Sequence, residues 1–352
     1  MSSKDNQTDP PMATLNTIQP PQRGGRRLES NLTIAFLLVV IVILLILVIR
    51  PVKLDVYKSI DEIEFADPAL AACVQQSAKD NGWQDIGHIV SLRCNHPSGG
   101  AVVSLGGIEH LVSLADVNLA FNAISDITPL AELPNLAVID LSHNRLSDIP
   151  VLRAADRLER LELNYNRFES LDWLETQKFL VLHSLSIAHN SLESLVPLRA
   201  APQLHELNVR KNRLVDISPA FALTDLELAD FGSNQIDSAA GLSALAKLKR
   251  LFLDRNELTS TAGLEGLIWL EELDLSSNPL TDVSSLAMLQ RLQRLDLSRT
   301  DIESLGDILA LGDIESLRLH GNSALSCDEV LDAVTEFGAA AVRHDLTCND
   351  GT

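Results

Sequence analysis

The stretch LPNLAVIDLSHNRLSDI at residues 133–149 carries the pattern that decides the fold. The same pattern returns in LERLELNYNRFESL at 158–171, where Leu161 and Leu163 alternate with Glu162. Side chains alternate between the two faces of a strand, so this spacing turns the leucines inward and the residue between them outward. Each such stretch therefore predicts one short strand with one buried and one exposed face.

Self-alignment extends this pattern over ten repeats, from about Leu111 to Leu325, including LKRLFLDRNELTS at 248–260 and LEELDLSSNPLTDV at 270–283. The step is 22 residues except for 24 between Asn166 and Asn190, and Thr300 takes one asparagine position. An amide that donates and accepts can satisfy backbone groups where the chain leaves a strand, so these asparagines are predicted to be structural. The marker asparagines are Asn122, Asn144, Asn166, Asn190, Asn212, Asn234, Asn256, Asn278 and Asn322.

The LxxLxLxxNxLxxL repeat resembles the leucine-rich-repeat family, in its short 22-residue class, which includes bacterial internalins and a protein phosphatase regulatory subunit. The resemblance implies an α/β solenoid, a curved array with a parallel concave sheet and short 3₁₀-like segments on the convex side. No single repeat can cover its own apolar face, so the stability is expected to come from stacking. Helical caps at both ends and one transmembrane helix complete the predicted architecture.

Two caps are expected to cover the ends of the solenoid, at 67–110 and 326–352. Asp67 and Pro68 form a cap and first-turn pair before the helix PALAACVQQSAKD, which runs towards Gly82 and is followed by the strand-like IVSLRC. Ser326 and Glu329 have the spacing of a capping box before CDEVLDAVTEF, and AVRHDLTC is the predicted last strand.

Each cap contains two cysteines 21 residues apart, Cys73 with Cys94 and Cys327 with Cys348. Of the three possible connectivities, only this local one avoids joining opposite ends of a long solenoid. Zinc binding lacks a CxxC or a close histidine pair, and reduced core thiols are a second alternative. Paired disulfides would place the solenoid in an oxidising compartment.

Residues 32–49, LTIAFLLVVIVILLILVI, are uncharged and long enough to cross a bilayer. A cleaved signal peptide is the alternative, but the run is long and no small-residue cleavage site follows it. We therefore expect a signal anchor after a disordered cytoplasmic tail at 1–31 and before a linker at 50–66. The solenoid would then be periplasmic or extracellular, and the bacterial inner membrane is favoured because the caps resemble those of bacterial repeat proteins.

The composition narrows the possible functions of the 352-residue chain. Hydrophobic residues make up 46% and aromatic residues only 4%, which suits an aliphatic core of thin layers. A formal net charge of −20 disfavours nucleic-acid binding. The sequence contains no nucleophile elbow, HExxH, Walker loop or dinucleotide fingerprint, so it predicts no enzyme, cofactor, metal site or small-molecule substrate.

Equivalent residues of stacked repeats form columns, and these predict a partner-binding concave face. The position before each marker asparagine is aromatic or imidazole in the first half and partly cationic in the second, while the outward strand position is mostly polar or acidic. The alternative is a solvated surface whose cations pair with nearby acids, and calcium binding by Asp254, Asp274 and Asp296 stays open. The predicted contact residues are Phe121, His143, Tyr165, His189, Lys211, Phe252, Arg255 and Arg299.

The sequence thus predicts a non-enzymatic, membrane-anchored protein that binds a protein partner in the cell envelope through its concave face. One alternative is a regulatory or signalling scaffold that acts through the cytoplasmic tail. Another is envelope polysaccharide binding by the aromatic half of the face.

Overall fold

The computed structural model describes residues 59–95 and 99–347. The chain divides into two units, Met1–Val56 and Tyr57–Thr352, and the described residues belong to the second. The predicted tail, the predicted span at 32–49 and most of the predicted linker lie outside them. Within the described part, no helix is both long and apolar enough to cross a membrane.

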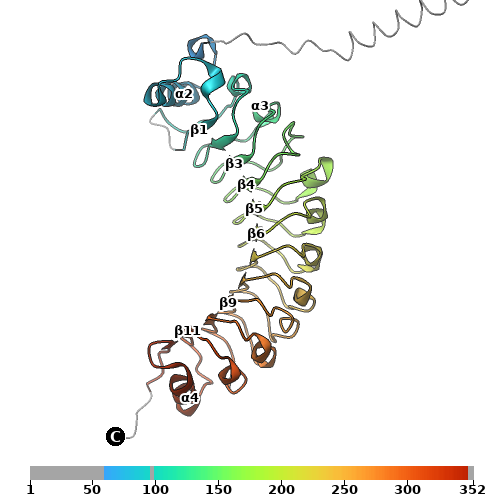
Figure 1. Cartoon of the computed structure of the whole chain (residues 1–352), viewed down its shortest axis with the longest axis vertical. Helices are drawn as coiled ribbons and strands as arrows, with labels where there is room; N and C mark the ends of the chain where they lie inside the picture. Colours follow the sequence, from blue (N-terminus) through green and yellow to red (C-terminus); the bar gives the residue numbers. More distant parts are fainter. Residues whose placement is uncertain (1–58, 96–98, 348–352) are drawn as a thin grey trace, which may run out of the picture. The chain divides into compact units, whose positions relative to one another are not determined.

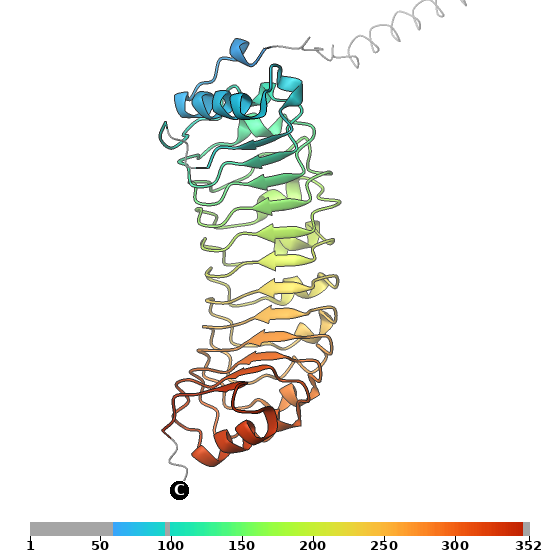
Figure 2. The same ribbon diagram turned by 60° about the vertical axis from the view of Figure 1, so that its left-hand side comes forward.

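The described residues form one parallel sheet whose twelve strands follow chain order along the concave side of a curved solenoid (Figures 1 and 2). The ten repeats supply β2 to β11, and the caps add β1 and β12. Neighbouring strands pair without a shift in repeat position, as Ile139 does with Leu161, so equivalent residues form columns. The strands are β1 (Ser91–Arg93), β2 (Asp116–Asn118), β3 (Val138–Asp140), β4 (Arg160–Glu162), β5 (Ser184–Ser186), β6 (Glu206–Asn208), β7 (Leu228–Asp230), β8 (Arg250–Phe252), β9 (Glu272–Asp274), β10 (Arg294–Asp296), β11 (Ser316–Arg318) and β12 (Val342–Arg343).

Short helical segments line the convex side, as the family resemblance implies (Figure 1). Several begin with a proline in the first turn, as at Pro197 and Pro219, where a missing N–H costs no helical hydrogen bond. The segments of the repeats are η3 (Ile108–His110), α3 (Thr128–Ala131), η4 (Asp172–Thr176), η5 (Val196–Ala200), η6 (Ser218–Ala222), η7 (Leu242–Ala244), η8 (Ser284–Met288) and η9 (Ile308–Ala310).

The marker asparagines link each coil to the one before it, which confirms their predicted structural role. The Asn144 Oδ1 accepts from the Ile124 N–H at 3.0 Å, and its Nδ2 donates to the carbonyls of Leu119 and Leu141 at 2.9 and 3.0 Å. At Thr300 the pattern changes, because the hydroxyl donates to the Leu297 carbonyl at 2.9 Å within its own coil. A single hydroxyl is too short to repeat the bridge that an amide makes.

The core is aliphatic through most of the array, with an aromatic cluster in the one long step. Leucines dominate the buried positions, and most are completely inaccessible. Between Asn166 and Asn190, Trp173 packs edge-on against Phe179 with ring centroids 5.8 Å apart. These large rings fill the wider coil that the two extra residues create.

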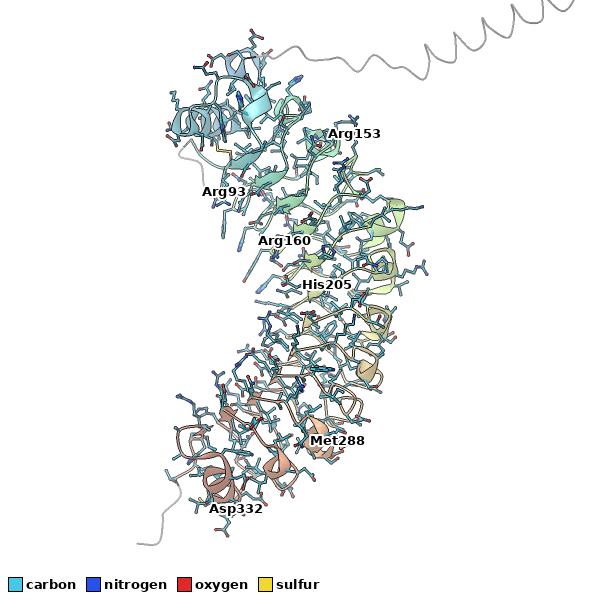
Figure 3. The ribbon with its side chains drawn as sticks, viewed as in Figure 1. Arg93, Arg153, Arg160, His205, Met288 and Asp332 are labelled. Atoms are coloured by element: carbon cyan, nitrogen blue, oxygen red, sulfur yellow. A yellow bond between two sulfur atoms is a disulfide. The ribbon has the colours of Figure 1, made fainter. Side chains whose placement is uncertain are left out.

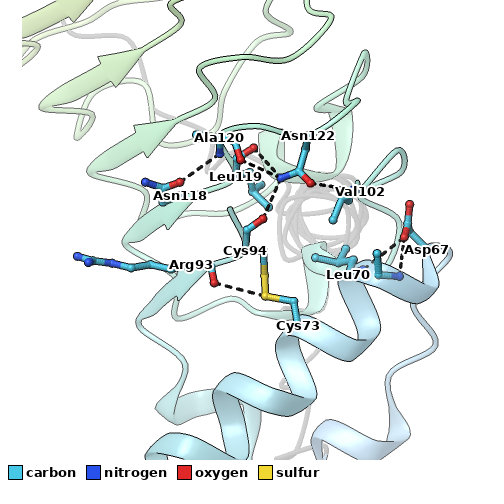
Figure 4. The surroundings of a disulfide bond; sticks show 11 residues. Asp67, Leu70, Cys73, Arg93, Cys94, Val102, Asn118, Leu119, Ala120 and Asn122 are labelled. Atoms are coloured by element: carbon cyan, nitrogen blue, oxygen red, sulfur yellow. Dashed lines mark hydrogen bonds between the residues drawn. A yellow bond between two sulfur atoms is a disulfide. The ribbon is translucent and has the colours of Figure 1, made fainter. Parts of the chain in front are cut away.

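At the N-terminal end, α2 (Pro68–Asn81) forms where the sequence predicts a helix and ends at Gly82 in the left-handed region. The Asp67 Oδ1 accepts from the Ala69 and Leu70 N–H groups, and Cys73 is bonded to Cys94 at the end of β1 (Figure 4). This disulfide confirms one of the two predicted pairs.

The folded cap begins earlier than the sequence analysis places it. Residues 59–66, assigned there to the linker, contain η1 (Ile60–Glu62), which contacts α2, and the buried Ile60. The Ala66 N–H donates to the Gly106 carbonyl at 2.9 Å. The linker is predicted to end where the first helix signal begins. Contacts with residues distant in the sequence instead decide where the folded cap begins.

The C-terminal cap contains α4 (Cys327–Phe337) and β12, and its capping box is only half formed. The Ser326 Oγ accepts from the Glu329 N–H, but the Glu329 carboxylate accepts from the Leu305 N–H at 2.7 Å. This carboxylate therefore ties the cap to the last coils instead of closing its own helix. Cys327 is disulfide-bonded, but its predicted pairing with Cys348 is not tested, because Cys348 lies outside the described residues.

Candidate partner-binding surface

The predicted contact residues divide between two places on the solenoid. Phe252 ends β8 and faces outward from the concave sheet, where Figure 3 also shows Arg160 of β4. The other seven belong to the column that precedes the marker asparagines, just beyond the strands; we call it the rim column. Its members are Phe121, His143, Tyr165, His189, Lys211, Ser233, Arg255, Ser277, Arg299 and Gly321.

The backbone of the rim column is left-handed in every coil, which the sequence analysis did not anticipate. Its nine non-glycine residues have φ between 54° and 59°, and Gly321 has φ 74°. This conformation costs a residue with a side chain about 1–2 kcal/mol. The turn still connects the coils, because the His143 N–H donates to the Asn164 carbonyl at 2.7 Å.

The first four side chains of the rim column form a continuous stack of rings. Phe121 lies 4.0 Å from His143, His143 lies 4.0 Å from Tyr165, and Tyr165 lies 3.8 Å from His189, measured between ring centroids. The interplanar angles are 12°, 13° and 17°, so the faces cover one another. Phe121 and Tyr165 are still 46% and 44% exposed, so the stack presents ring edges to solvent.

A shallow hollow lies between the ring stack and the strands beside it. Asp140, Glu162 and Arg210 are among the residues that line it. Burial, together with the negative charge of Asp140, raises the pKa of the Glu162 carboxyl. The hollow on the inner side of the ring stack thus contains two carboxyl groups, those of Asp140 and Glu162, beside the Arg210 guanidinium.

Two ion pairs on the concave face span three coils: Arg160 reaches Glu206 at 3.7 Å, and Arg210 reaches Asp254 at a shorter distance. The Arg210 guanidinium donates to both carboxylate oxygens of Asp254 at 2.7 and 2.6 Å, passing over Gly232 in the coil between them. A Cβ at Gly232 would collide with the Arg210 Nη1 and the Asp254 Oδ1. This clamp is not among the predicted contacts, although an Arg, Gly, Asp series at one repeat position is a signal for it.

The three acids considered for calcium are held in other ways. Asp254 is bound by Arg210, and the Oδ1 atoms of Asp274 and Asp296 accept from the N–H groups of Ser276 and Ser298. Burial raises the pKa of the Asp274 carboxyl. Over residues 59–95 and 99–347, no group of three or more His, Cys, Asp or Glu side chains could hold a metal ion.

The cations on the strands and those of the rim column differ in whether they form ion pairs. Arg294 pairs with Glu272 at 3.1 Å and Arg318 with Asp296 at 3.4 Å, as the solvated-surface alternative expects. Lys211, Arg255 and Arg299 are exposed and form no ion pair within the described part of the chain. Positive charge is therefore left available at the rim of an acidic protein.

Comparison with known proteins agrees with this architecture. Residues 112–154, 246–288 and 268–311 match a family profile described as Leucine Rich repeats (2 copies), which covers less than half of the chain. No curated protein matches the sequence.

Several solved structures share the fold. An internalin (InlF) from Listeria monocytogenes is similar with a TM-score of 0.68 and 22% identity, over 85% of this chain and 95% of that one. The functional domain of InlJ from the same organism gives a TM-score of 0.64 and 23% identity, over 82% and 61%. A leucine-rich-repeat protein of Leptospira interrogans gives 0.61 and 24%, over 74% of each. The chain thus contains leucine-rich repeats and folds as a leucine-rich-repeat solenoid, with internalins among its structural neighbours.

Proposed function

We propose that this protein is a non-enzymatic, membrane-anchored interaction protein that holds a protein partner against its concave face and rim column. The conformation of the rim column carries the proposal. Glycine would relieve the left-handed strain at every coil, as it does at Gly321, yet nine coils keep a side chain there. Strain retained at exposed positions favours a use for the side chains beyond folding.

The arrangement of the rings favours a protein over a polysaccharide. Sugars pack against open aromatic faces, but the faces of His143 and Tyr165 are covered by their neighbours in the stack. Tyrosine and arginine are also the residues that most often anchor protein interfaces. The aromatic half of the rim column therefore supports a polypeptide partner.

The anchor and its orientation belong to the same proposal. Residues 32–49 would cross the membrane with the N-terminus in the cytoplasm and the solenoid in the periplasm or outside the cell. The Cys73–Cys94 disulfide supports this setting, because disulfides persist in oxidising compartments. Blocking free thiols with a membrane-impermeant reagent in intact cells, before and after reduction, tests it. Labelling of Cys73 and Cys94 that appears only after lysis and reduction, and not after reduction of intact cells, would contradict the proposed compartment.

The binding site can be tested by capturing the partner from native membranes with the full chain. Crosslinking with mass spectrometry first identifies the captured proteins, and Tyr165→Ala/Arg255→Ala should then recover several-fold less of them. Arg153→Ala/Met288→Ala is the matched control, because Figure 3 places both residues on the convex side. Capture that is unchanged in the first variant would refute the concave face as the binding site.

A shortened chain separates this proposal from the tail-based scaffold. Removing residues 1–30 leaves the predicted span and the solenoid in place. If the partner is held by the concave face, its capture should persist after this deletion. Loss of the same crosslinks on deletion would favour the alternative in which the tail contacts an effector.

A further inference from the structure

We infer that the N-terminal half of the rim binds an acidic segment of the protein partner. The inference rests on the proposed function and adds the chemistry of the occupant. The surface concerned, which we call the basic rim, consists of the ring stack from Phe121 to His189 together with Arg145, Arg167 and Lys211.

The two arginines of the basic rim lie in the same turns as the stacked rings. Arg145 and Arg167 follow His143 and Tyr165 by two residues, and their N–H groups donate to carbonyls of the preceding coil. Both side chains are exposed, and neither forms an ion pair with another described residue. Lys211 continues the column beyond His189 and lowers the pKa of that imidazole, after the larger effect of burial.

The exposed ring edges add to the positive electrostatic potential of the arginines. An aromatic ring is negative on its faces and positive at its edge. Stacking hides the faces of His143 and Tyr165 and leaves ring edges outward, so the exposed parts of the stack repeat the sign of the guanidinium groups. The basic rim therefore presents three exposed cations and ring edges to solvent, with the exposed acids Asp148 and Glu169 within three residues of Arg145 and Arg167.

Acids beside the basic rim restrict where the occupant can lie. Asp140 and Glu162 line the hollow on the inner side of the rings, and its cation Arg210 is already paired with Asp254, so an acidic segment is favoured on the outer side. Further along the solenoid, Glu257 and Asp301 occupy the positions equivalent to Arg145. The second half of the rim is thus partly neutralised, which confines the inference to the first half.

The geometry also distinguishes a polypeptide from other anions. Single-stranded nucleic acids are held by bases stacked on open aromatic faces, and the stack offers none between Phe121 and His189. Carboxylates need only the guanidinium groups and the ring edges, and arginine can bind a carboxylate through two hydrogen bonds. An acidic peptide segment fits the exposed groups.

The test measures binding of a fluorescent peptide of alternating Glu and Ser to the full-length protein in detergent. The Glu peptide should bind with an affinity that falls as salt is added, and its Gln and Ser counterpart should not bind. The variant Arg145→Gln/Arg167→Gln/Lys211→Gln should weaken binding by roughly tenfold or more, since it removes three available charges.

The control variant Arg153→Gln/Arg157→Gln/Lys178→Gln makes the same change in net charge at exposed cations outside the rim. If the position of the cations matters, and not only the net charge, the control variant should bind the Glu peptide with an affinity within about twofold of the parent. Arg145→Lys/Arg167→Lys keeps the charge but loses the paired hydrogen bonds of arginine, so its affinity should fall between those of the parent and the Gln variant. Thermal unfolding of each variant checks that the solenoid is intact.

Three results would overturn the inference: no binding by the parent, equal losses in the rim and control variants, or tighter rim-dependent binding of oligothymidylate or heparin. The last would assign the basic rim to another class of anion. Failure of the proposed function has a different sign: capture of the partner from native membranes would be unchanged in Tyr165→Ala/Arg255→Ala. If that capture responds while the Glu peptide does not bind, the proposed function stands and this inference falls.

Discussion

At the level of single residues, the marker asparagine position controls how firmly each coil is attached to the previous one. Asn278 accepts from the Leu258 N–H at 3.0 Å and donates to the Leu253 and Leu275 carbonyls at 2.9 Å each. Thr300 donates to the carbonyl of Leu297, in its own coil. The interface before Thr300 therefore lacks the side-chain bridge that its neighbours have.

Thr300→Asn should raise the free energy of unfolding by about 1–2 kcal/mol, because the new amide could bind the Leu280 N–H and the Leu275 carbonyl. Thr300→Val, which removes the hydroxyl with little change in volume, should lower it by about 1 kcal/mol. Urea unfolding followed by circular dichroism measures both. A destabilised Thr300→Asn protein would mean that the coil has repacked around threonine.

At the level of elements, contacts between coils that are not neighbours distinguish this solenoid from a plain stack of repeats. Arg210 reaches over the intervening coil to Asp254, and hydrogen bonding to that carboxylate raises the pKa of the guanidinium. The Asp254 carboxylate is largely screened from water at 7% exposed, whereas the Arg210 side chain is 31% exposed. Such a pair is costly to break from one side, because the remaining charge stays buried.

Gly232→Ala should destabilise the protein by about 2–4 kcal/mol, because the added methyl group displaces the Arg210 guanidinium from Asp254. Gly312→Ala is the matched control, since nothing lies within 4 Å of a Cβ at that position. Urea unfolding of the two variants makes the comparison. An unchanged midpoint for Gly232→Ala would show that the clamp contributes little.

At the scale of the whole molecule, stability passes from coil to coil, so the ends are the weak points. Most contacts of a solenoid repeat are with its neighbours, and a terminal layer without a cap exposes its core to water. The described N-terminal end is closed by α2, the Cys73–Cys94 disulfide and the docked segment from Ser59 to Ala66. The C-terminal end depends on α4 and on the contact from Glu329 to Leu305.

Cys73→Ser/Cys94→Ser should therefore loosen the N-terminal cap before the central coils. Loop closure across 21 residues accounts for about 3 kcal/mol of stability. Hydrogen exchange should show faster exchange in α2 and β1, with β5 to β8 close to the parent. Uniformly faster exchange along the solenoid would indicate that the array unfolds as a single unit.

Much of the architecture follows from the sequence alone, because it depends on the short-range periodicity of apolar residues. Alternation around Leu161 and Leu163 gives the strands, the 22-residue step gives the stacking, and Asp67-Pro68 and Gly82 mark the ends of α2. The Cys73–Cys94 pair was also predictable, since a spacing of 21 residues links a cap helix to the strand after it.

The tertiary structure decided the details of the surface. The sequence placed aromatic and basic residues in one column, but only the left-handed turns and the register between coils bring the His143 ring centroid to 4.0 Å from those of Phe121 and Tyr165. The clamp across Gly232 and the docking of residues 59–66 likewise join groups that local patterns treat as independent. Periodicity fixes which residues share a face, whereas side-chain rotamers and contacts between coils determine what that face presents.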